Sequence, residues 1–154
     1  MAVFITGAGV KPVLEKLASD YAVGESVFLN VNGVSTEFLV VHQGNPDTSK
    51  YDVSCDGTWL LMKDIYEKRA WRDGANANIY KNSTIHTYLN GDFLSLLDAD
   101  IQSAIKTVKI PYVNGTGLDG DVDSGAYGLS TQIFLLSGYE LGRTKSNDSY
   151  TPID

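Results

Sequence analysis

The clearest alternation of apolar and polar residues lies between residues 26 and 40. The alternating apolar positions are Val27, Leu29 and Val31 in a first run and Phe38 and Val40 in a second. Asn32 and Gly33 stand between the two runs. Both residue types tolerate the positive φ that tight hairpin turns require. The pattern therefore predicts a β-hairpin with one buried face.

Apolar residues at helical spacing occur in three places, each beside a residue that suits the start of a helix. Pro12 fits a first turn, and Ser83 and Asp98 are N-cap residues. The inward positions would be Val13, Leu14, Leu17 and Ala18, then Ile85, Tyr88 and Leu89, and finally Ile101, Ile105 and Val108. Asn90 and Gly91 tolerate the left-handed conformation, so we expect the second helix to stop there.

The other segments predict strands and loops. Apolar runs at residues 3–5, 58–65 and 133–136 are strand candidates, whereas residues 43–57 and 112–128 are rich in Gly, Asp and Ser and predict exposed loops. The sequence therefore predicts an α+β fold, in which a mixed or antiparallel sheet is combined with two or three short helices.

The stretch at residues 133–141 resembles a strand and turn from the interior of a larger sheet. Nothing after residue 142 has the apolar alternation that would cover it. An uncovered edge exposes unpaired N–H and C=O groups that attract another strand. We therefore expect this edge to be completed by a neighbouring subunit, by a separate chain or by residues beyond this sequence, and we expect a homo-oligomer.

Composition narrows the class of protein. The chain has 154 residues, 43% hydrophobic and 20% charged, which suits one domain with a core. A formal charge of −7 disfavours nucleic acid as a partner. No stretch approaches the roughly 20 apolar residues of a membrane helix, so membrane insertion is not expected. A single cysteine, Cys55, excludes an intrachain disulfide and fits folding in a reducing cytoplasm.

Three aspartates in the second glycine-rich segment are a candidate metal site. Asp119, Asp121 and Asp123 alternate, as the oxygen ligands of a calcium loop do. Ser124 occupies the place of the glycine that an EF-hand requires, and Ser130 the place of its glutamate. We interpret the segment as a solvated loop without a metal, with an irregular calcium site as the alternative.

No pattern predicts a catalytic site or a cofactor. His42, His86 and Cys55 lie in three separate segments, and Asp52 and Asp56 flank the cysteine. Nearby carboxylates raise the pKa of a thiol, which disfavours a nucleophile. Residues 4–9 start like a dinucleotide-binding turn, but the third glycine is absent. We therefore expect no enzyme and no cofactor.

The aromatic residues favour a recognition surface. Large amphipathic rings in or beside loops commonly form binding contacts, and half-buried packing is the alternative for each ring. The candidates are Tyr51, Tyr66, Trp71, Tyr80, Tyr112 and Tyr127, with Tyr150 near the C-terminus.

Four blocks, taken in order, resemble a family of uncharacterised domains of the DUF6273 type. They are DGTWLLMKDIY at residues 56–66, NSTIHTYLN at 82–90, VKIPY at 108–112 and IFLLSGYE at 133–140. Such domains are encoded by phages, prophages and Gram-positive gut bacteria. The resemblance covers roughly residues 23–154 and implies a C-type-lectin-like fold, similar also to formylglycine-generating enzymes.

The resemblance also implies a domain organisation. Longer members continue into a Trp-Trp-Leu-Arg-Ser box and a final strand, which this chain lacks. We therefore expect an incomplete lectin-like domain at residues 23–154, preceded by a lead or docking segment at residues 1–22.

These observations together predict a non-enzymatic structural or adhesion-associated protein of the bacteriophage virion, such as a tail, fibre, collar or head-decoration component. Its partners would be other virion proteins and a glycan or protein of the host surface. A calcium-dependent carbohydrate-binding module, or an enzyme on the same lectin-like scaffold, is the alternative.

Overall fold

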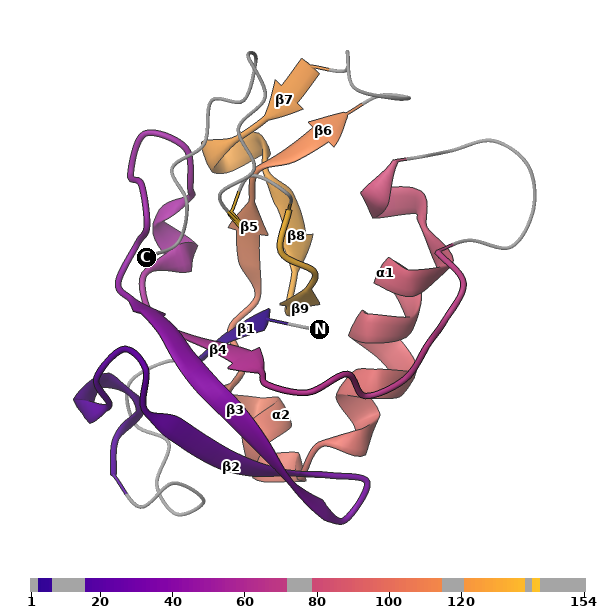
Figure 1. Cartoon of the computed structure of the whole chain (residues 1–154). Coiled ribbons are helices and arrows are strands. Elements are labelled where there is room, and N and C mark those ends of the chain that lie inside the picture. The colour runs from indigo at the N-terminus through magenta and orange to yellow at the C-terminus, as the bar shows by residue number, and fades with distance from the viewer. Residues whose placement is uncertain (1–2, 7–15, 72–78, 115–120, 138–139, 142–154) are drawn as a thin grey trace.

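A five-stranded antiparallel sheet organises the chain (Figure 1), with the strand order β2-β3-β4-β1-β9. Its strands are β1 (Val3–Thr6), β2 (Ser26–Val31), β3 (Val34–Gln43), β4 (Thr58–Met62) and β9 (Ile133–Phe134). This computed structural model describes residues 3–6, 16–71, 79–114, 121–137 and 140–141. The α+β prediction is confirmed.

The β2–β3 hairpin forms where the alternation predicts it. Asn32 and Gly33 take φ values of 51° and 74°, and Val31 pairs with Val34 across the turn. Along β2 every second side chain is buried, beginning with Val27. The two-residue turn thus fixes the register that directs these apolar side chains into the core.

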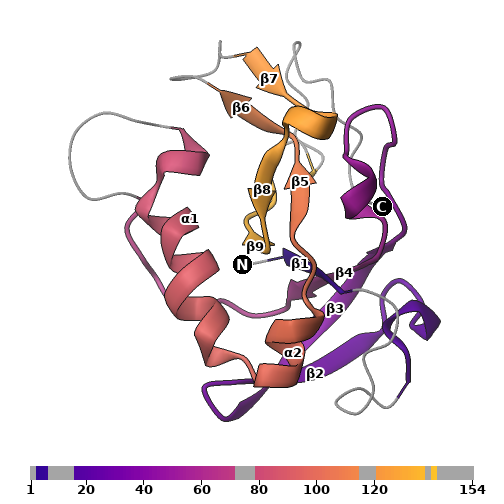
Figure 2. The ribbon, with the colours of Figure 1, turned by 180° about the vertical axis from the view of Figure 1, so that it is seen from behind.

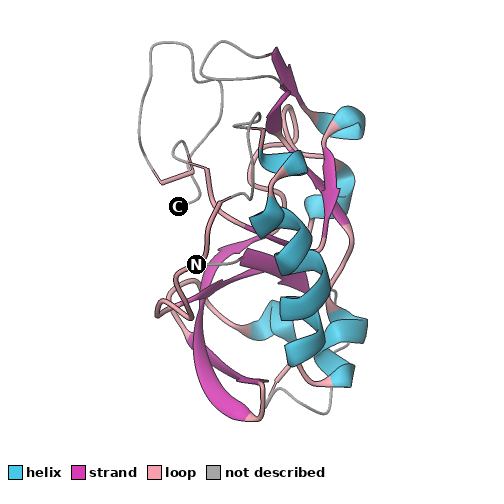
Figure 3. Ribbon diagram, turned by 90° about the vertical axis from the view of Figure 1, so that its right-hand side faces the viewer, coloured by secondary structure: helices cyan, strands magenta, loops and turns pink. Residues whose placement is uncertain are grey.

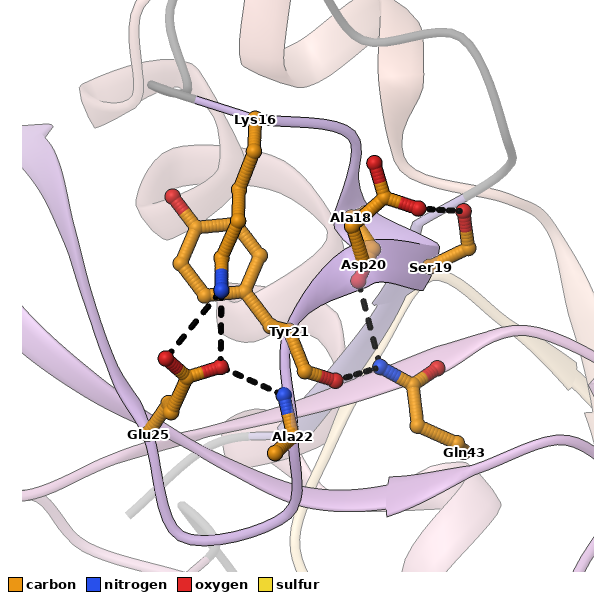
Figure 4. Close-up of polar contacts among 8 residues, drawn as sticks. All are labelled: Lys16, Ala18, Ser19, Asp20, Tyr21, Ala22, Glu25 and Gln43. Atoms are coloured by element: carbon orange, nitrogen blue, oxygen red, sulfur yellow. Dashed lines mark hydrogen bonds and ion pairs between the residues drawn. The ribbon is translucent and has the colours of Figure 1, made fainter.

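The N-terminal segment takes part in the sheet. β1 lies between β4 and β9 and pairs with both. Figure 4 shows how the next described residues attach to the end of β3, where Gln43 Nε2 donates to the carbonyl oxygens of Ala18 and Tyr21 at 3.1 and 2.8 Å. The expected separation of residues 1–22 from the domain therefore does not hold for the described residues, because residues 3–6 form an inner strand.

Helical structure is concentrated between residues 80 and 104. It comprises η3 (Tyr80–Asn82), α1 (Thr84–Tyr88), the π-helical turn η4 (Leu89–Phe93), η5 (Leu94–Leu96) and α2 (Ala99–Ala104), with η1 (Ala18–Asp20) apart from them. Ser83 caps α1 as predicted, since its hydroxyl accepts from the His86 N–H at 3.1 Å. Of the helix expected at residues 12–18, residues 12–15 lie outside the described residues.

Two predicted helix ends are wrong. Asn90 and Gly91 do not stop the second helix, because the chain continues through η4 and η5 and the Asn90 side chain bonds to other segments. The third helix ends at Ala104, and Val108 belongs to a strand. Asp98 stands at its N-cap but accepts from Asn30 Nδ2 at 2.8 Å instead of bonding to the helix.

Two short ribbons extend the fold, β5 (Val108–Ile110) with β8 (Leu129–Thr131) and β6 (Tyr112–Asn114) with β7 (Asp121–Asp123). Figures 1 and 2 place β6 and β7 at the end of the molecule opposite α2. The expectation of a loop over residues 112–128 is therefore wrong at β6 and β7 and at η6 (Gly125–Tyr127).

The sheet supports two hydrophobic clusters. The larger one joins side chains of the sheet to α1, η4 and α2, and Figure 3 shows these helices on one side of the strands. The smaller one gathers around Trp59 and includes Phe134, Val108 and Tyr51. Tyr51 and Cys55 are buried there, and Cys55 ends η2 (Val53–Cys55). The expectation that residues 43–57 form an exposed loop is thus wrong for Tyr51 and Cys55.

The edge of the sheet at β9 is closed within the chain. The Asn90 amide donates to the Ile133 carbonyl oxygen at 2.9 Å and accepts from the Ile133 N–H at 3.1 Å. The Tyr80 hydroxyl accepts from the Leu135 N–H at 3.0 Å. The predicted open edge at residues 133–141 is therefore wrong at Ile133 and Leu135, because side chains of the helical segment take the place of another strand.

A close approach of two backbones requires glycine at position 128. A Cβ added to Gly128 would lie 2.7 Å from the carbonyl oxygen of Ile110, in the neighbouring strand. We predict that Gly128→Ala destabilises the fold by about 1–3 kcal/mol, since the backbone of β5 must shift. Urea unfolding measures the change.

Gly91 provides the matched control, because an added Cβ meets nothing within 4 Å there. We expect Gly91→Ala to leave stability unchanged or to raise it by about 0.4–1 kcal/mol. Equal losses in the two variants would contradict the proposed clash.

Candidate functional site

The aromatic residues singled out in the sequence divide into buried and exposed groups. Tyr51 and Tyr112 are buried and Tyr80 is half-buried, so the first two are not surface residues as expected. Tyr66, Trp71 and Tyr127 are 41%, 44% and 83% exposed. Tyr150 lies outside the described residues. Tyr66 and Trp71 share a cavity, whereas Tyr127 lies on η6 away from it.

The cavity has a volume of about 220 Å³ and is lined by residues from the end of β4 to Trp71, from α1 and η4, and by Leu135. Figure 1 shows the chain after β4 running toward these helices. Its apolar lining comes from four parts of the chain. These are Met62 of β4, Ile85 of α1, Leu89 and Phe93 of η4, and Leu135 after β9. Met62, Leu89 and Phe93 belong to the main hydrophobic core, so this part of the cavity has a fixed shape.

The aromatic walls are held by contacts behind them. Trp71 packs against Tyr80 with ring centroids 5.7 Å apart, and its carbonyl oxygen accepts from the Ile85 N–H at 3.3 Å. Tyr66 meets Phe93 edge to face at 5.3 Å. These contacts position both exposed rings before any ligand arrives.

Three polar groups form one corner of the cavity. Arg69 Nε donates to Glu67 Oε1 at 3.1 Å, and the Arg69 guanidinium lies 3.6 Å from the centre of the Tyr88 ring. A hydrogen bond from Tyr88 and the contact with Arg69 lower the pKa of Glu67. Burial, followed by the hydrogen bond to Glu67, raises the pKa of Tyr88 to about 12. The corner thus presents a carboxylate and a guanidinium beside an uncharged phenol.

This arrangement is suited to binding a small amphipathic molecule. Buried apolar side chains take an apolar group, exposed rings stack on a flat face, and the Glu67–Arg69 pair offers an acceptor and donors. Glu67, Arg69 and the cavity role of Tyr88 are not predicted by the sequence patterns. Glu67 and Arg69 follow a strand without a recognisable motif, and nothing in the sequence pairs them with Tyr88.

His42, His86 and Cys55 have different surroundings in the structure. His42 lies beside the Trp59 ring, with centroids 6.4 Å apart, and His86 Nε2 is 3.3 Å from the Thr131 hydroxyl. Cys55 Sγ donates to the Lys109 carbonyl oxygen at 3.3 Å. Burial raises the pKa of Cys55 to about 12, which disfavours the nucleophilic thiolate at neutral pH.

The aspartate segment is described only in part. Asp119 lies outside the described residues, as does the Asp121 side chain, whereas the Asp123 carboxylate accepts from the Tyr112 hydroxyl at 2.8 Å. In the described part of the chain, no three His, Cys, Asp or Glu side chains form a group that could hold a metal ion.

A second polar site is buried beneath the surface. Glu140 accepts from the Tyr51 hydroxyl at 2.5 Å and from the Ser137 N–H at 2.6 Å. Burial raises the pKa of Glu140 even though both hydrogen bonds lower it. This carboxyl group therefore links the segment after β9 to residue 51 and is a titratable group inside the fold.

The fold and the cavity together define an α+β domain with a cavity lined by aromatic side chains. The family model "Domain of unknown function (DUF6273)" matches residues 56–151, and the chain belongs to this family. No curated protein and no solved structure matched the chain. The matched segment contains every cavity residue, whereas β1, β2 and β3 lie before it and complete the sheet.

None of the helices in the described ranges has the length and apolar composition needed to cross a bilayer.

Glu140 gives a pH prediction. A raised pKa means that the folded state holds this proton more tightly than the unfolded chain, so the stability that it contributes is full below the ordinary pKa of 4.5 and is lost as the pH rises toward the raised value. We predict that Glu140→Gln gains stability relative to the natural chain when the pH rises from about 4.5 to 7. Urea unfolding across this range measures the difference.

Glu25 is the matched control, because its hydrogen bond from Lys16 lowers its pKa. Relative to Glu25→Gln, the natural chain is expected to gain stability as the pH rises through the ordinary carboxyl range. A constant difference between the natural chain and Glu140→Gln would contradict the assignment.

Proposed function

We propose that this protein is a non-enzymatic, adhesion-associated structural component of a bacteriophage particle, in a tail, fibre, collar or head decoration. The observation that carries the proposal is the prearranged aromatic cavity, which lies wholly within the segment that matches the family. The resemblance of that segment to phage- and prophage-encoded domains supplies the virion setting. In this role the cavity contacts a glycan or protein of the host surface.

A C-type-lectin-like fold is part of the proposal. An antiparallel sheet with helices on one side and short ribbons beyond it supports this assignment. One scaffold of this kind hosts many functions, so the role is argued from the cavity and not from the fold.

The proposed assembly partners are other virion proteins or further copies of this chain. Two apolar side chains on the β2–β3 hairpin, Phe28 and Val34, are 58% and 65% exposed. Val34 pairs with buried Val31 and Phe28 pairs with Glu37, so the two side chains lie on opposite faces of the hairpin. Each face thus offers one exposed apolar side chain to another protein surface. The hairpin is therefore the surface that we propose such a partner covers.

The particle test uses phage particles from a strain that encodes the chain. We expect the protein to band with intact particles in a density gradient and to be identified there by mass spectrometry. Recovery only from the soluble fraction of the lysate, with none in the particles, would contradict the virion role.

Binding of purified protein to host cells tests the cavity. We predict that Trp71→Ala weakens binding about tenfold or more, because exposed aromatic anchors carry much of the binding energy at such sites. Tyr127→Ala is the control, since this ring is exposed but distant from the cavity. Equal binding of host cells by both variants would show that the cavity is not the binding site. Loss of binding on calcium chelation would instead favour a calcium-dependent carbohydrate-binding module.

A further inference from the structure

We infer that the ligand of the cavity is a pyranose ring that carries an N-acetyl group. This inference rests on the proposed recognition role and adds the chemistry of the ligand. It follows from three different surfaces that meet in one cavity, each of which selects a different part of such a molecule.

Trp71 provides the stacking surface. Its indole is 44% exposed, and Tyr80 and the backbone of α1 hold it from behind. The face of an aromatic ring is negatively polarised and attracts positively polarised groups. The axial C–H groups on one side of a pyranose ring are such a surface, so we expect the sugar to lie flat against the indole. Because the indole is already held in place, little side-chain entropy is lost on binding.

The Glu67–Arg69 pair provides the polar contacts. Sugar hydroxyls donate and accept hydrogen bonds, and the carboxylate accepts while the guanidinium donates. The two side chains are already oriented by their 3.1 Å contact and by Tyr88. Since the two charges are opposite, a cationic ligand meets Arg69 and an anionic ligand meets Glu67. A neutral ligand avoids both repulsions.

The apolar floor selects the N-acetyl group. This floor consists of half-buried Ile85 and Leu135 and of the almost fully buried Met62, Leu89 and Phe93. These side chains offer no hydrogen bond to a ligand, so a hydroxyl group placed on them loses its bonds to water without compensation. A methyl group placed there buries apolar surface at no such cost. A sugar with an acetamido substituent thus contacts the Trp71 indole, bonds to the Glu67–Arg69 pair and places its methyl group on the apolar floor. Glucose can make only the first two of these contacts.

The size of the cavity is consistent with one ring. Its volume of about 220 Å³ is below the roughly 300–1,000 Å³ of pockets that enclose drug-sized ligands. We therefore expect a terminal or branching sugar to enter, with any remaining glycan chain left outside.

The test is an NMR titration of ¹⁵N-labelled full-length protein with N-acetylglucosamine, N-acetylgalactosamine and glucose, in the presence of a chelator. The chain contains two tryptophans, so the indole N–H signal of buried Trp59 is an internal control for that of Trp71. We expect an N-acetyl sugar to shift the Trp71 signal and not the Trp59 signal. Glucose should bind about tenfold more weakly or less, the difference expected for a missing methyl contact.

Trp71→Ala should abolish the response of the cavity residues, and Tyr127→Ala should retain it. Because Trp71→Ala also removes packing against Tyr80, Glu67→Gln is a second variant that leaves the aromatic walls intact, and we expect it to weaken binding. Two results would overturn the inference. One is equal binding of glucose and N-acetyl sugars, and the other is a set of chemical-shift changes that stays the same in Trp71→Ala and Glu67→Gln.

The outcome is separable from that of the proposed function. Trp71-dependent binding to host cells without any response to N-acetyl sugars overturns the ligand and leaves the recognition role standing. A cavity response to N-acetyl sugars in a protein that is missing from particles overturns the virion role and leaves the ligand standing.

Discussion

The hydrogen bonds of the Asn90 side chain hold the separate parts of this domain together. Its amide nitrogen donates to the carbonyl oxygens of His86 and Ile133, at 3.0 and 2.9 Å. Its amide oxygen accepts from the N–H groups of Gln132 and Ile133, at 2.7 and 3.1 Å. One side chain thus offers β9 the donor and the acceptor that a neighbouring strand would provide. Without it, the N–H of buried Ile133 would lose its acceptor, which is costly away from water, and the Ile133 carbonyl oxygen would keep the Thr131 hydroxyl, at 3.0 Å, as its side-chain donor.

The position of the cavity depends on this junction. Asn90 lies within η4, which also carries Leu89 and Phe93 of the cavity lining. The hydrogen bonds of its amide hold β9, and Leu135, another residue of the cavity lining, follows β9 directly in the chain. The helical segment can therefore not move from the sheet without opening the cavity. The π-helical geometry of η4 accompanies this role, as π-turns commonly occur at functional positions. The contacts that close the sheet edge thus also hold Leu89 and Phe93, the η4 residues of the cavity lining, against the sheet.

Local patterns in the sequence were sufficient for the elements that depend on local physics. The Asn32-Gly33 turn, the alternation along β2 and the Ser83 cap each depend on residues close in the chain. The failures involve distant partners. Asn90 and Gly91 resemble a helix end, and only the location of Ile133, 43 residues later, explains why the helix continues. Tyr51 has the sequence surroundings of a surface aromatic residue, but in the fold it packs against Trp59 and donates to Glu140. Likewise, Glu67, Arg69 and Tyr88 become a site only when the fold brings them together.

The most direct test of this account is the free energy of urea unfolding of Asn90→Ala, compared with Asn30→Ala. Asn30 also makes a side-chain hydrogen bond, to Asp98 at 2.8 Å, but it lies at the surface. Because Asn90→Ala leaves the N–H groups of Gln132 and Ile133 without their acceptor, at about 1–3 kcal/mol each, we predict a loss of about 3 kcal/mol or more, against about 1 kcal/mol for Asn30→Ala. Similar small losses in the two variants would contradict a central role for the Asn90 amide.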